Sequence, residues 1–144
     1  MSARKIVLLC ALGAVAVAAG GVAMAAKTKG MYVPADKLEF KEIVPGVSQA
    51  VLWGDPRKGP YGALTKFAPN TKHPLHSHAN TIKMVVITGN LIMDTGTGEV
   101  TYGPGSYLLA PGGSQHTSGT DGNGCLIFEE GAGKFTMTMV QEKK

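Results

Sequence analysis

Residues 70–89 read NTKHPLHSHANTIKMVVITG, and residues 105–120 read GSYLLAPGGSQHTSGT. These two stretches hold every histidine of the chain, namely His73, His76, His78 and His116. Side chains two residues apart in a strand point to the same face, so His76 and His78 can present two imidazoles to one metal ion. A third ligand must come from a different strand. His116 is the natural candidate, because a strand and a Pro-Gly-Gly turn precede it and could fold it back across the same cavity.

The rest of the chain predicts an all-β fold. Short β-type runs separated by Gly, Pro and Asn occur at residues 38–43, 48–53, 61–67, 75–78, 81–88, 91–94, 107–110, 125–130 and 134–140. Turn residues fall between them, among them Gly89-Asn90 and the segment 121–124. Strands at this spacing are typical of an antiparallel sandwich or barrel. We expect one barrel domain over residues 38–144, preceded by a tether at residues 26–37.

The two histidine stretches resemble the two motifs of the cupin family, small β-barrels that hold a metal between them. The first family motif is Gly, five residues, His-x-His, three or four residues, Glu, six residues and Gly; here it runs from Asn70 through His76 and His78 to Gly89. The second is Gly, five residues, Pro-x-Gly, two residues, His, three residues and Asn; here it runs over residues 105–120. The resemblance implies a cupin-type antiparallel β-barrel, jelly-roll-like, with one divalent metal ion on His76, His78 and His116.

One departure from the family pattern changes the expected metal site. Ile82 stands where the family has its metal-binding Glu, and under the longer spacing the position falls on Lys83, whose ammonium cannot coordinate. The inferred ligands are then three neutral imidazoles, which leave the metal its full charge and favour an anion or oxygen donor. Lys83 could anchor an acidic ligand, but alternation with Ile82 and Met84 favours a solvent-facing side chain.

Other polar residues each allow two interpretations. His73 lies an odd number of residues from His76, so simple alternation points it away from the pair, although Pro74 bends the chain. We expect His73 to lie behind the ligands or on the surface, with a fourth ligand as the alternative. Alternation turns either Glu129 or Glu130 inward, where a carboxylate could act as general base or replacement ligand. We favour a strand end that reaches solvent. Further candidates to line the cavity are Tyr61, Met84, Tyr107 and Gln115, and Cys125 reads as a buried strand thiol.

The sequence does not decide which metal binds or whether the protein is an enzyme or a binding module. Imidazole-rich sites suit zinc, iron and copper, whereas the family resemblance points to iron or manganese, because cupins with three histidines and no Glu include oxygen-using enzymes. One hypothesis is a metal-dependent enzyme, an oxygenase or lyase, acting on a small oxygen-bearing molecule. The alternative is a non-catalytic module that binds or senses a metal or small ligand.

The first residues predict export. Arg4 and Lys5 precede an apolar stretch, and Ala23-Met24-Ala25 carries small residues at the positions that a signal peptidase reads. We therefore expect a signal peptide at residues 1–25, a periplasmic or secreted protein and no stable membrane span after cleavage. A retained anchor is the alternative, since the stretch is long enough to span a bilayer.

The composition excludes nucleic acid as a partner. The formal net charge is only +4, part of which comes from Arg4 and Lys5, and the basic residues are scattered without aromatic interleaving. A small-molecule ligand or substrate is the expected partner. By analogy with short cupins that dimerise, the β run at residues 38–53 is a candidate homodimer interface.

Overall fold

The computed structural model describes residues 30–141, so the expected signal segment lies outside the described residues. Within them no helix is long and apolar enough to cross a membrane. Residues 33–141 form one unit of antiparallel strands, in which the described part of the chain has a single short 3-10 helix, η1 (Ala35–Lys37). The strands are β1 (Lys41–Val44), β2 (Val47–Gly54), β3 (Tyr61–Phe67), β4 (Lys72–Ser77), β5 (Ile82–Asp94), β6 (Glu99–Tyr102), β7 (Tyr107–Ala110), β8 (Gln115–Gly131) and β9 (Thr138–Met139).

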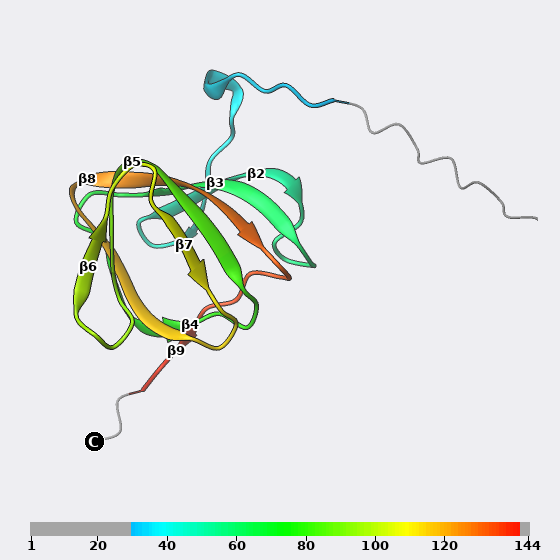
Figure 1. Cartoon of the computed structure of the whole chain (residues 1–144). Helices are drawn as coiled ribbons and strands as arrows, with labels where there is room; N and C mark the ends of the chain where they lie inside the picture. Colours follow the sequence, from blue (N-terminus) through cyan, green and yellow to red (C-terminus); the bar gives the residue numbers. More distant parts are fainter. Residues whose placement is uncertain (1–29, 142–144) are drawn as a thin grey trace, which may run out of the picture. The chain divides into compact units, whose positions relative to one another are not determined.

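The strand β8 is the centre of the sheet. Its first part pairs with β4 and its last part with β3, while β5 pairs with β8 along nearly its whole length. The remaining pairs are β1 with β2, β2 with β3, β4 with β9, and β5 with β6 and β7, all antiparallel. Figure 1 shows the sheet curled on itself, with β2 and β3 on one side and β6 on the other. The predicted all-β antiparallel barrel is confirmed.

Two predicted turns were wrong, because glycines carry the strands through them. Gly89-Asn90 lies inside β5, and the segment 121–124 lies inside β8. Gly89 and Gly124 have φ values of 71° and 70°, and a Cβ on Gly89 would lie 2.0 Å from the carbonyl oxygen of Gly124. This close crossing at a left-handed backbone bends β5 and β8 around the barrel without ending either strand. Of the strand predicted at residues 134–140, only β9 (Thr138–Met139) forms. The strand β6 (Glu99–Tyr102) was not predicted from the sequence.

Alternation decides which side chains fill the barrel. Along β5, Lys83, Val85 and Ile87 face outward and are exposed, while the residues between them are buried. Burial raises the pKa of the Cys125 thiol to about 11, which agrees with the predicted buried thiol. The core cluster consists of Ile82, Met84, Val86, Leu91, Met93, Leu108, Ala110, Cys125 and Ile127.

Two irregularities shift the alternation and bring further polar side chains inward. In the pairing of β4 with β8, His73 faces Ser118 and His76 faces His116, so β4 has one extra residue between the two pairs. In β8, the even-numbered His116 and Ser118 line the interior cavity, whereas beyond the segment 121–124 the odd-numbered Glu129 does so. Both His73 and Glu129 therefore lie on the inner face of the sheet.

Candidate metal centre

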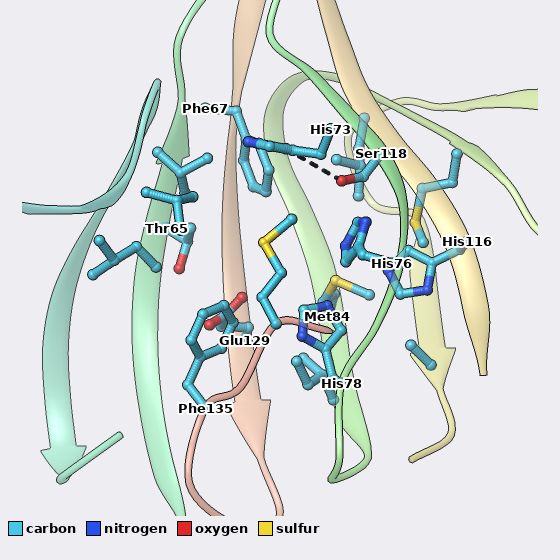
Figure 2. Close-up of a pocket in the computed structure, with 18 residues that line it drawn as sticks. Thr65, Phe67, His73, His76, His78, Met84, His116, Ser118, Glu129 and Phe135 are labelled. Carbon is cyan, nitrogen blue, oxygen red and sulfur yellow. Dashed lines mark hydrogen bonds between the residues drawn. The ribbon is translucent and has the colours of Figure 1, made fainter. Parts of the chain in front are cut away.

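The fold brings together the three histidines that the sequence singled out. One ring nitrogen each of His76, His78 and His116 lies within 4.8 Å of the others. The ring centroids are 4.4 Å apart for His76 and His116, 5.1 Å for His76 and His78, and 5.3 Å for His78 and His116. Figure 2 shows the three rings gathered on one side of the cavity. Among the described residues this is the group whose spacing could hold a metal ion.

Backbone carbonyls fix the orientation of two of these rings. The Nδ1 atom of His76 lies 2.8 Å from the carbonyl oxygen of Pro74, and Nδ1 of His78 is hydrogen-bonded to the carbonyl oxygen of Thr136. A carbonyl oxygen can only accept, so each Nδ1 carries the hydrogen and donates it. The lone pair of each ring is then on Nε2. Metal-binding histidines are held in the same way by a hydrogen bond from the second nitrogen.

The environment keeps the histidines neutral. Burial lowers the pKa of His76 and of His78, and it lowers the pKa of His116 to about 4 with the help of the two neighbouring rings. A neutral imidazole is the form that coordinates a metal. Three neutral nitrogen donors fit an imidazole-binding divalent metal such as zinc, iron or copper.

The structure confirms that an apolar side chain, Ile82, stands where the family has its metal-binding Glu. Ile82 is buried and lines the same cavity as the histidines, so no oxygen ligand comes from this place in β5. Lys83 is exposed on the outer face, opposite Leu109 of β7 and Glu130 of β8, in agreement with the alternation of the strand. Lys83 therefore cannot anchor a ligand inside the barrel.

The histidine cluster opens into a small cavity in the barrel. Its volume is about 60 Å³, far below the roughly 300 to 1,000 Å³ of pockets for drug-sized ligands. The wall is largely apolar, with Phe67, Met84 and Phe135 among its residues. The polar groups on the wall besides the cluster are Thr65, His73, Ser118 and Glu129. A ligand of only a few non-hydrogen atoms fits this space.

Glu129 was expected at a solvent-exposed strand end, and that expectation was wrong. Its side chain is 5% exposed and lines the cavity. Its Oε1 atom accepts hydrogen bonds from Nε2 of Gln49 at 2.7 Å and from the hydroxyl of Tyr61 at 2.9 Å. Burial raises the pKa of Glu129 to about 7 against the effect of these donors. Glu130 is the residue of the pair that faces outward, opposite Lys83.

Simple alternation pointed His73 away from the cavity, and this direction was wrong, whereas the expected place beside the ligands agrees with the structure. The extra residue in β4 turns it inward, where its ring packs edge-on against Phe67 and His76 at centroid distances of 6.1 and 6.3 Å. Its Nδ1 atom is 3.5 Å from the hydroxyl of Ser118. Its Nε2 atom is buried without a hydrogen-bond partner among the described residues. His73 remains outside the group of three nitrogens that could share one metal.

Of the other residues that the sequence predicted to line the cavity, some are buried in the barrel and some lie on its outer surface. Met84 lines the cavity, whereas Tyr61 is fully buried, is not part of the cavity lining and donates a hydrogen bond to Glu129. Tyr107 and Gln115 are exposed and belong to the outer surface. Figure 2 shows Glu129 on the opposite side of the cavity from His116.

A small antiparallel barrel with a histidine cluster in its cavity has the architecture of a cupin. The family model described as the ChrR cupin-like domain matches residues 28–132, and the chain belongs to this family. A comparison with curated protein sequences gave no match.

Solved structures share the fold at low sequence identity. The polyketide cyclase RemF from Streptomyces resistomycificus is 18% identical, covers 81% of this chain and 89% of its own, and has a TM-score of 0.65. KdgF from Halomonas sp. is 15% identical, with 71% and 94% covered and a TM-score of 0.59. An RmlC-like cupin from Shewanella frigidimarina NCIMB 400 is 12% identical, with 72% and 91% covered and a TM-score of 0.60.

Proposed function

We propose that this protein is a metal-binding cupin that holds one divalent cation on His76, His78 and His116 and binds a small oxygen-bearing molecule beside it. The observation that carries the proposal is the geometry of the cluster. Its ring nitrogens lie within 4.8 Å of one another, and two of the rings are oriented by carbonyl oxygens behind them. A bound metal would supply Lewis-acid or redox chemistry.

The charge and size of the cavity support the proposed kind of ligand. The three imidazoles are neutral and Ile82 replaces a carboxylate, so the ligand set does not offset the charge of a divalent cation. An anion or an oxygen donor is the group that such a centre attracts. The cavity of about 60 Å³ restricts this molecule to a few non-hydrogen atoms.

Glu129 favours an enzyme over a purely binding module. From the sequence, a carboxylate at position 129 or 130 was only an alternative to a solvent-facing strand end, and Ile82 stands where the family has its carboxylate. Glu129 supplies one, because its carboxyl lines the cavity and its pKa of about 7 lets it take or give a proton near neutral pH. Oxygen uptake or product formation on a panel of small diketones, thiols and hydroxy acids distinguishes the two functions. Tight binding without product supports the module.

The metal site is tested by elemental analysis of the purified protein. We expect about one equivalent of a transition metal per chain, lost in His116→Ala and retained in His73→Ala. His73 is the matched control, because its ring lies beside His76 but outside the group of three nitrogens. Metal content that is absent, or equal in the wild type and His116→Ala, overturns the proposal.

Export is a further part of the proposal, supported by the charge and apolar pattern of residues 1–25. The mass of the intact protein recovered from its native host tests it. A chain that begins at Ala26 supports cleavage after Ala25. A full-length chain in the cytoplasm contradicts export.

A further inference from the structure

Apart from His73 and Ser118, the polar groups of the cavity lie at two separate places. The histidine cluster occupies one side, and the carboxyl of Glu129 occupies the other (Figure 2). Glu129 is not part of the group whose ligand atoms lie within 4.8 Å of one another. The rest of the wall is largely apolar and includes Met84 and Phe135. A ligand in this cavity therefore meets two polar ends rather than one.

The carboxyl of Glu129 is held in place by buried neighbours. Gln49 and Tyr61 both donate to its Oε1 atom, and the amide of Gln49 also donates to the hydroxyl of Thr65 at 3.3 Å. The exposed fractions are 3% for Gln49, 0% for Tyr61, 2% for Thr65 and 5% for Glu129. The carboxyl group is thus fixed by side chains from β2 and β3 before any ligand arrives.

The second oxygen of this carboxyl is available to a ligand. The hydrogen bonds from Gln49 and Tyr61 both go to Oε1, and Oε2 is not among the fully buried side-chain atoms that lack a partner in the described part of the chain. A carboxylate oxygen can accept more than one hydrogen bond. A ligand that brings a donor to Oε2 forms a hydrogen bond to it, whereas an apolar ligand of the same shape covers this oxygen without giving it a donor.

We propose that Glu129 accepts a hydrogen bond from the ligand whose other end lies at the histidine cluster. The ligand class is a short carboxylate of a few carbons that carries an ammonium or hydroxyl group at its far end. This inference rests on the proposed metal site, because the carboxylate end is bound by the cation. The positive centre at one end and Glu129 at the other match the two ends of such a molecule.

Calorimetric titration of the zinc-loaded full chain at pH 8 tests the proposal with two probes. β-Alanine and butyrate have the same number of non-hydrogen atoms, but only β-alanine ends in an ammonium group, which can donate and cannot accept. We expect β-alanine to bind at least about tenfold more tightly than butyrate. Zinc content is measured by elemental analysis on every sample.

The variant Glu129→Gln tests which residue is responsible. The Gln side chain keeps a carbonyl oxygen for the donors of Gln49 and Tyr61, so its amide nitrogen takes the place of Oε2 and faces the ammonium group. We expect it to lose at least about tenfold of the β-alanine affinity and to bind butyrate within about twofold of the wild type. Glu130→Gln, with the neighbouring carboxyl on the outer face, is the control and keeps the preference.

The outcomes separate this inference from the proposed metal site. Equal affinities for the two probes in zinc-loaded wild type overturn the inference, as does a preference that survives in Glu129→Gln. If that variant does not fold, the wild-type comparison alone decides. A chain that takes up no zinc contradicts the metal site itself, which the analysis of metal content shows independently of the probes.

Discussion

His76 and His116 face each other across the pairing of β4 with β8, with their ring centroids 4.4 Å apart. Directly opposite residues on neighbouring antiparallel strands have Cβ atoms about 4.5 to 5.5 Å apart, so strand pairing itself sets this distance. His78 follows the end of β4, and the carbonyl of Thr136 holds its ring. The candidate metal site is therefore built mainly on sheet backbone, which favours a geometry formed before the metal binds.

We expect the metal to be retained in mildly acidic solution. Metal and proton compete for the same imidazole nitrogens, and burial lowers the pKa of all three rings, that of His116 to about 4. Zinc should stay bound at a pH of about 5.5 and be released as the pH falls toward about 4. Dialysis at a series of pH values, followed by elemental analysis, measures this.

A short oligohistidine peptide is the control for the release of zinc. Its solvated rings should lose zinc near their ordinary pKa of about 6.5. Release from the protein at the same pH as from the peptide would show that burial does not keep these histidines neutral.

Glu129 should make the protein less stable as the pH rises. Its pKa is about 7 in the folded protein and 4.5 as the ordinary value, so the folded state binds the proton more tightly. The stability that comes from this difference is fully present below about 4.5 and is lost as the pH rises through about 7. It amounts to something on the order of 3 kcal/mol. Urea unfolding of metal-free wild type and Glu129→Gln at several pH values measures the change.

The difference between the two proteins is the informative quantity here. The histidines titrate in both, so their contribution cancels in the comparison, and the stability of wild type relative to Glu129→Gln should fall with rising pH. Glu130→Gln controls for the loss of a carboxylate from the same strand. A relative stability that is flat from about pH 4.5 to 8 rules out a raised pKa for Glu129.

Gly89→Ala should destabilise the barrel strongly. The added Cβ would lie 2.0 Å from the carbonyl oxygen of Gly124, and φ at Gly89 is 71°, where side chains are disfavoured. We expect a loss of at least about 2 kcal/mol in the free energy of unfolding. Gly59→Ala is the control, since a Cβ there meets nothing within 4 Å, and should change stability by less than about 0.5 kcal/mol. Similar stabilities of the two variants in urea would contradict this account of the crossing.

Replacing His73 with an apolar residue should stabilise the protein. Its Nε2 atom is buried without a partner among the described residues, and such an atom costs about 1 to 3 kcal/mol. His73→Leu removes the cost and keeps an apolar contact with Phe67, so we expect a gain of about 1 kcal/mol in urea unfolding. Metal content should not change. A less stable variant would mean that the ring contributes packing or hydrogen bonding that outweighs its unpaired nitrogen.

Alternation along the chain predicted side-chain directions wherever a strand was regular. It placed Lys83 outside and Met84 inside, and it grouped His76 with His78, as the structure shows. It failed for His73, because one extra residue in β4 lies between His73 and His76. Nothing in a single sequence marks such an irregularity clearly, although Pro74 indicated that the strand is interrupted there.

The environment of Glu129 could not be predicted, because its partners are remote in the sequence. Gln49 and Tyr61 lie on β2 and β3, and strand pairing alone brings them to the end of β8. The sequence around Gln49 contains no motif that indicates that its side-chain amide is buried. The fold, in contrast, depended on motif spacing and on the recurrence of short strands, both of which are local signals.

The irregular segment 121–124 also limits how the length of this chain can vary. His116 and Glu129 are 13 residues apart, so a β8 of this length that alternated without interruption would turn Glu129 to the outer surface while His116 kept its place. Related chains with the same length but a regular strand at this point should therefore keep the histidines but lack a carboxylate inside the barrel, whereas chains one residue shorter keep both inside with a regular strand. The spacing across residues 121–124 thus becomes a marker, readable in an alignment, for which relatives share the second polar end of the cavity.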